Sequence, residues 1–182
     1  HNYTKAAEYY TQIIYTKDEL EDMPIKILAM LSFAALNVFR GDYHEAYDIC
    51  DQAIRKIKQH HVYGRLTYAY VLMYEITVYL GKYDQAFIYK DLAEKQLKKN
   101  KNSIHKGYQV AFYHTSAWLC VCFGDYAGEL KYLNKMLNII SDSEYSAYKP
   151  FVLFRLELNK LASFKIDSTI ELTKLYTELM KR

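Results

Sequence analysis

The sequence has few residues that break helices and few cysteines. Its 182 residues include only six Gly and two Pro. A β fold with many turns needs more of both, so their scarcity favours long helices. The cysteines at positions 50, 120 and 122 are odd in number, which gives no basis for a disulfide framework. Composition therefore predicts an all-α protein.

The charge balance and the apolar runs exclude further classes. The net charge of +3 is too small to predict direct binding to nucleic acid. The apolar runs are short and interrupted, so neither a signal peptide nor a membrane span is predicted. Unpaired cysteines favour the cytoplasm; a periplasmic location is the alternative if a signal peptide has been removed. A Lys-rich stretch at 95–106 is interpreted as a solvated connection, with an acidic partner as the alternative.

What the chain does have is a repeated string. "GDYHEAYDIC" begins at Gly41, "GKYDQAFIYK" begins at Gly81, and "GDYAGE" begins at Gly124. A second marker confirms the last step, because Gly64 and Gly107 are forty-three residues apart, as Gly81 and Gly124 are. The same register places Tyr at 3, 43 and 83 and Ala at 6, 46 and 86. Two markers that share one offset indicate a structural repeat.

Each repeat reads as two helices joined at the Gly-x-Tyr string. The Gly supplies the left-handed residue that ends the first helix. Asp42 or Asp125 can then cap the second helix through its side-chain oxygen. A small residue near the start of the second helix, Ala46 or Ala86, allows the two helices to approach closely. We therefore expect both Ala side chains to be buried where the helices of one unit touch.

This pattern predicts nine helices in five units. The expected helices are 3–15, 23–39, 43–59, 62–80, 83–98, 104–123, 126–140, 143–163 and 168–181. The units are 1–22 (partial), 23–61, 62–102, 103–141 and 142–182, forming one domain. "SDSE" at 141–144 reads as a capping box. Pro150 predicts a kink, or a short helical turn that stops before it.

These strings resemble the tetratricopeptide repeat family. That family has a large residue, a small residue and a Tyr in its first helix, Gly-x-Tyr at the turn, and Ala in its second helix. The second unit matches with Met30, Phe33, Ala34, Asn37, Gly41, Tyr43, Ala46, Cys50 and Ala53. The resemblance implies a right-handed superhelix, an α-solenoid of stacked antiparallel helix pairs, with a concave groove that holds peptides.

The chain departs from the family in two ways. Glu129 stands where the fourth unit should have a small residue, so we expect looser packing there. The repeats are about forty residues long, against about thirty-four in the family, which is similar to the long repeats of bacterial sensors and transcriptional regulators. Because the chain starts inside a unit, we expect it to be a fragment of a longer protein. Its first helix should rest on the second unit or on another copy, with Tyr3, Tyr10 and Ile14.

No catalytic or cofactor motif is present. His60 and His61 are adjacent and have no acidic ligand at metal spacing. Cys120 and Cys122 are two residues apart, so a helix does not bring them to one face. Gly-rich phosphate loops and hydrolase or metalloprotease motifs are lacking. We therefore expect no enzyme activity, no metal and no cofactor.

The expected function is binding of a protein or peptide partner in an apolar, aromatic groove. The residues assigned to that groove are Tyr68, Glu75, Tyr79, His114, Trp118 and Arg155. Trp, Tyr and Arg dominate the energetics of protein interfaces, and His114 predicts a pH dependence near its usual pKa of about 6.5. The alternative is a sensory or dimerising region of a bacterial transcriptional regulator or sensor kinase whose output domain lies outside this chain, with a homodimer as a further expectation.

Overall fold

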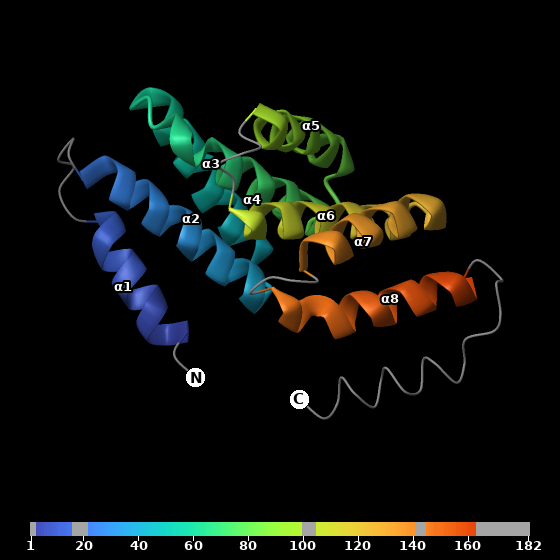
Figure 1. Cartoon of the computed structure of the whole chain (residues 1–182). Helices are drawn as coiled ribbons and strands as arrows, with labels where there is room; N and C mark the ends of the chain where they lie inside the picture. Colours follow the sequence, from blue (N-terminus) through green and yellow to red (C-terminus); the bar gives the residue numbers. More distant parts are fainter. Residues whose placement is uncertain (1–2, 16–21, 100–104, 141–144, 163–182) are drawn as a thin grey trace. The chain divides into compact units, whose positions relative to one another are not determined.

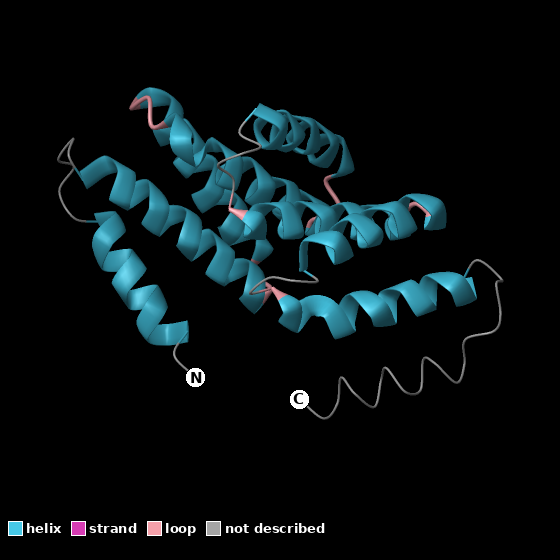
Figure 2. Ribbon diagram, viewed as in Figure 1, coloured by secondary structure: helices cyan, strands magenta, loops and turns pink. Residues whose placement is uncertain are grey.

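The computed structural model describes residues 3–15, 22–99, 105–140 and 145–162. Within these residues it contains eight α-helices and no strand, which confirms the all-α prediction (Figure 2). The chain divides into two compact units, residues 1–103 and 104–182. This division, at 103/104, lies one residue from the predicted boundary between repeats, 102/103. The ninth predicted helix, 168–181, and the predicted capping box at 141–144 lie outside the described residues.

The first unit is built from five helices, which Figure 1 colours from blue to green. They are α1 (Tyr3–Tyr15), α2 (Met23–Arg40), α3 (Tyr43–Gln59), α4 (Leu66–Tyr79) and α5 (Tyr83–Lys99), with a 3-10 turn at Tyr63–Arg65 before α4. Each helix packs on the next one in the chain, and α2 also contacts α4. The unit therefore contains the predicted helix pairs α2–α3 and α4–α5.

The second unit contains α6 (Lys106–Cys122), α7 (Tyr126–Ile140), a 3-10 turn at Ser146–Tyr148, and α8 (Lys149–Ala162). Helix α7 packs against both α6 and α8. Apolar residues from all three helices form its core, namely Val110, Ala117, Leu133, Met136, Ile140, Val152 and Leu156. That the two units form one domain, and that their helices continue as a superhelix, stay predictions.

The three Gly-x-Tyr turns share one hydrogen-bond pattern, as the repeat predicts. Gly41, Gly81 and Gly124 have φ values of 84°, 69° and 69°, the left-handed conformation that Gly adopts without strain. In each turn the residue after the Gly donates its N–H to the carbonyl five residues earlier, at 2.9, 2.9 and 2.8 Å. This bond identifies the Schellman end of a helix. The left-handed turns are therefore confirmed in all three repeats.

The predicted side-chain caps are confirmed at one turn and wrong at another. Asp125 Oδ1 accepts a hydrogen bond from the backbone N–H of Gly128 at 2.8 Å, so it caps α7. Asp42 makes no such bond to α3. Its carboxylate lies 3.2 Å from Nε of Arg40, the last residue of α2, which attracts the charge away from the helix start.

The small residues of the repeat are buried, as predicted; that each lies where the helices of one unit touch stays a prediction. Ala46 on α3 and Ala86 on α5 are both fully buried, and so is Cys50 one turn after Ala46. The Cys50 thiol donates to the carbonyl of Ala69 on α4, and burial raises its pKa well above the usual range. This bond joins the second helix of the second repeat to the first helix of the third.

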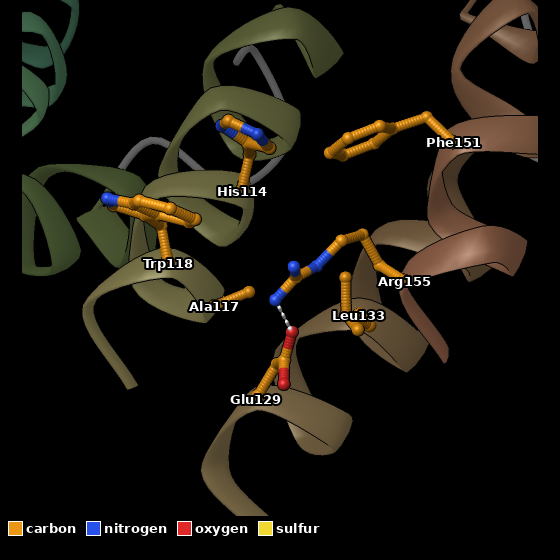
Figure 3. A pocket seen from close by; sticks show the side chains of 7 residues that line it. All are labelled: His114, Ala117, Trp118, Glu129, Leu133, Phe151 and Arg155. Carbon is orange, nitrogen blue, oxygen red and sulfur yellow. Dashed lines mark hydrogen bonds and ion pairs between the residues drawn. The ribbon is translucent and has the colours of Figure 1, made fainter. Parts of the chain in front are cut away.

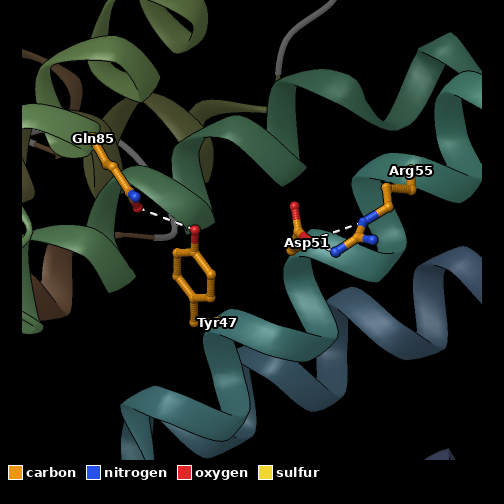
Figure 4. A network of polar contacts seen from close by, with 4 residues as sticks. All are labelled: Tyr47, Asp51, Arg55 and Gln85. Carbon is orange, nitrogen blue, oxygen red and sulfur yellow. Dashed lines mark hydrogen bonds and ion pairs between the residues drawn. The ribbon is translucent and has the colours of Figure 1, made fainter.

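A polar clip also joins α3 to the start of α5 (Figure 4). The Tyr47 hydroxyl donates to Gln85 Oε1 at 3.1 Å, and Lys82 Nζ lies 4.0 Å from the centre of the Tyr47 ring. One helical turn further along α3, Asp51 forms an ion pair with Arg55. Tyr47 therefore links the second repeat to the third.

Pro150 is accommodated by one of the two arrangements that the sequence predicts. The 3-10 turn at Ser146–Tyr148 ends before it, and α8 begins at Lys149 with Pro150 as its second residue. Pro is tolerated there because its missing N–H would have no partner in the first turn of a helix. The predicted helix start at 143 is thus wrong by six residues.

Helix α1 packs on α2 but none of its residues is buried. The rings of Tyr10 and Phe33 lie with centroids 6.5 Å apart, whereas Tyr3 remains exposed. The prediction that this helix rests on the second repeat is therefore confirmed for Tyr10. Contact with another copy of the chain stays a prediction.

Candidate binding site

In the first unit, the predicted site residues occupy the one accessible stripe of α4. Eleven of the fourteen residues of this helix are buried, and the other three are Tyr68, Glu75 and Tyr79. Their spacings of seven and four residues place them on one face of the helix. The structure thus places all three predicted residues on the one partly exposed face of α4.

Glu75 and Tyr79 interact directly within that stripe. The Tyr79 hydroxyl donates a hydrogen bond to the Glu75 carboxylate, and the Tyr79 ring stacks on Tyr43 of α3 with centroids 5.0 Å apart. Burial raises the pKa of Glu75 to about 7, although the bond from Tyr79 lowers it. Burial and the neighbouring Glu75 and Tyr43 also raise the pKa of Tyr79 to about 12. The carboxylate is therefore held in surroundings that disfavour its charge.

In the second unit, the other three predicted residues line one pocket between α6, α7 and α8 (Figure 3). His114 and Trp118 lie one turn apart on α6, and Arg155 extends from α8 toward them. The other lining residues are Ala117, Glu129, Leu133 and Phe151. The pocket has a volume of about 100 Å³ and a largely apolar wall. Trp118 is 42% exposed, so it forms a rim and is not part of the core.

Arg155 is held at this pocket by Glu129 of α7. Its Nη2 donates to Glu129 Oε1, and Asn159 Nδ2 donates to Glu129 Oε2 at 2.8 Å. Asn159 also reaches the backbone carbonyl of Tyr126 at 2.8 Å. The Glu129 side chain is only 2% exposed, against 22% for Arg155. Both carboxylate oxygens are therefore engaged, and α8 is anchored to the start of α7.

Glu129 corrects one expectation and was missed as a site residue. The sequence predicted looser packing at this position, where the repeat should have a small residue. Instead the carboxylate is buried and fully hydrogen-bonded. The sequence did contain a signal for this role, namely a Glu at a repeat position that is normally small and buried. A buried Glu needs a charged or hydrogen-bonding partner.

His114 faces both the ring of Phe151 and Arg155 of α8 (Figure 3). The His114 and Phe151 ring centroids are 5.6 Å apart. Burial lowers the pKa of His114 from its ordinary value, and the positive charge of Arg155 lowers it further. Any pH dependence from His114 is therefore expected below the predicted value of about 6.5.

The predicted site residues thus form two sets, each described within its own unit. Tyr68, Glu75 and Tyr79 share a stripe of α4, and His114, Trp118 and Arg155 share a pocket. That the two sets belong to one concave surface stays a prediction.

Other possible sites have little support in the described part of the chain. No group of three or more His, Cys, Asp or Glu residues gathers there as metal ligands. Helix α2 is apolar and long enough to cross a membrane, with a mean hydropathy of 1.4, but half of that stretch is buried inside the unit. The core helix of a helical bundle passes the same test, so the absence of membrane insertion stays a prediction.

Comparison with known proteins adds no assignment. No model of a known protein family matches the sequence, and no curated protein matches it significantly. The resemblance to tetratricopeptide repeats accordingly depends on the repeated turns and helix pairs described above.

Proposed function

We propose that the chain is a non-enzymatic repeat module that binds a peptide or an extended protein segment. The observation that carries this proposal is the pocket of the second unit, with the indole of Trp118 exposed at its rim. Aromatic and Arg side chains at a concave, desolvated position are the residues from which binding hot spots are made.

The size of the pocket favours a side chain as its occupant. Pockets for cofactors and drug-sized ligands have volumes of roughly 300–1,000 Å³. An apolar cavity of about 150 Å³ takes up benzene. The pocket here, at about 100 Å³, has room for one aliphatic side chain.

The polar groups of the pocket favour a hydrogen-bond acceptor beside that side chain. Both oxygens of Glu129 are already engaged, so the pocket has no free carboxylate oxygen. Arg155 has five N–H donors, and Glu129 is its one acceptor among the described residues. A peptide backbone carries a carbonyl next to every side chain. An apolar peptide residue could therefore pack its side chain against the apolar wall while its backbone carbonyl accepts hydrogen bonds from the unused N–H donors of Arg155.

The proposal is tested by selecting binders from a displayed library of random peptides. Affinities of the selected peptides are then measured by calorimetry for the parent chain and for Trp118→Ala. Truncation of a hot-spot Trp costs on the order of 2 kcal/mol or more, so the variant should bind at least about thirty-fold more weakly.

Phe123→Ala is the matched control, because Phe123 is exposed in the same unit and does not line the pocket. It should leave the affinity unchanged. Equal affinity for parent and Trp118→Ala chains would contradict the proposal, as would a library that yields no binder.

A further inference from the structure

The accessible stripe of α4 carries a carboxylate, Glu75, that no cation among the described residues neutralises. Among the described residues, the only group that bonds to Glu75 is the Tyr79 hydroxyl. A half-buried carboxylate in a stable protein ordinarily has a cation or several donors beside it. Glu75 has no such cation among the described residues, and it lies on a partly exposed face of α4. This combination indicates a site for a positively charged group of a ligand.

Two basic residues at the ends of the neighbouring helices are engaged elsewhere. Arg40, at the end of α2, pairs with Asp42. Lys82, just before α5, lies over the ring of Tyr47. The other titratable groups facing this position are Tyr79 itself and Tyr43 of α3, which stacks on Tyr79. Among the described residues of the first unit, no ion pair to Glu75 is formed, and no cation contributes to its pKa.

We propose that this stripe binds an arginine side chain of the peptide partner, with the guanidinium paired to Glu75 and lying against the ring of Tyr79. The proposal deepens the proposed function, because it names one residue that the bound segment should contain. Arginine is preferred to lysine because its planar guanidinium can pair with a carboxylate through two donors while it stacks on an aromatic ring. Tyr79 is positioned for both roles, since its hydroxyl already contacts the carboxylate.

The state of Glu75 makes the interaction dependent on pH. With a pKa of about 7 the carboxyl is mostly protonated at pH 6 and mostly ionised at pH 8. A guanidinium pairs with the ionised form, so the apparent affinity is proportional to the ionised fraction of Glu75. That fraction is about ten times larger at pH 8 than at pH 6, so binding should be about tenfold tighter at pH 8. By linkage, the bound cation should lower the pKa of Glu75.

The test uses a small probe and does not depend on finding the natural partner. The 182-residue chain is labelled with ¹³C at Glu carboxyl carbons, and Glu75 is assigned by its loss in Glu75→Gln. The titration of Glu75 is followed by NMR without and with N-acetyl-arginine amide. N-acetyl-citrulline amide serves as the neutral control of the same shape. Glu45, exposed on α3, serves as the control carboxylate.

The arginine compound should move the titration of Glu75 to lower pH, leave Glu45 in place, and bind about tenfold more tightly at pH 8 than at pH 6. The citrulline compound should have no effect on Glu75, and N-acetyl-lysine amide a smaller one. The proposal is overturned if arginine leaves Glu75 unchanged, if citrulline shifts it equally, or if Glu45 shifts as much.

These outcomes separate the inference from the proposed function. Peptides that depend on Trp118 but leave the Glu75 titration unaffected by arginine would support the function and reject the arginine site. An arginine response at Glu75 without any peptide that depends on Trp118 would support the site and reject the function.

Discussion

The ion pair between Arg155 and Glu129 gives the sharpest prediction about stability. Substitution Arg155→Met keeps most of the aliphatic stem but removes the charge that neutralises a carboxylate with 2% exposure. Asn159 alone would then bond to Glu129. Removing one partner of a buried ion pair costs about 3–5 kcal/mol, because the other charge is left uncompensated. Arg155 is itself 22% exposed, so we expect the lower end of that range.

The double variant Arg155→Met/Glu129→Met should be more stable than Arg155→Met alone. It leaves no unpaired charge, and replacing a buried ion pair by apolar residues of similar volume is often neutral. Asn159 would keep its bond to the Tyr126 carbonyl at 2.8 Å. The double-mutant cycle should therefore show a favourable coupling between the two positions of about 2 kcal/mol or more.

Urea unfolding followed by tryptophan fluorescence measures this directly. Trp118 is the one Trp of the chain and lies beside the pair, so the signal reports the second unit. Lys131→Met is the matched control, because Lys131 is exposed on α7 and should change stability by no more than about 0.5 kcal/mol. The reasoning is refuted if Arg155→Met costs no more than Lys131→Met, or if the double variant loses the sum of the two single losses.

The remaining predictions concern packing, a turn and a titration. Ala46→Leu or Ala86→Leu should cost about 1–3 kcal/mol by overpacking a fully buried contact; unchanged thermal midpoints for both would contradict the repeat register. Gly128→Ala should destabilise the second unit in urea, because its Cβ would lie 2.1 Å from Asp125 Oδ2 and 2.8 Å from Cys120 Sγ; an unaffected midpoint would mean that the cap of α7 is dispensable. The folded pKa of Glu75 is raised to about 7, so its charge lowers stability increasingly as pH rises from about 4.5 to 7. Glu75→Gln should therefore gain stability relative to the parent between pH 5 and pH 8, and a constant difference across that range would reject the raised pKa.

The turns were predictable because their cause is local. A Gly at the end of an apolar helix segment is the residue that adopts a left-handed conformation without strain, and the three repeats of the string identify it. Ala46 and Ala86 were predictable for a related reason, since a small side chain at a fixed distance from the turn leaves room for the neighbouring helix. Sequence spacing alone determines both features.

The side-chain partners were less predictable because they depend on residues distant in sequence or on competing charges. Asp42 has the type and position of a cap, yet Arg40 two residues earlier attracts its carboxylate. Arg155 was assigned to the groove, but its partner Glu129 is twenty-six residues away on another helix. The lowered pKa of His114 likewise arises from burial and from Arg155, neither of which a local motif encodes.

The measurement that tests the central claim most directly is the set of intermolecular NOEs between a library-selected peptide and the chain. The account predicts NOEs from the Trp118 indole and the Phe151 ring to the aliphatic side chain of one peptide residue, because these two rings line the pocket that should receive it. A peptide that binds with NOEs to other surfaces and none to Trp118 or Phe151 would contradict the account.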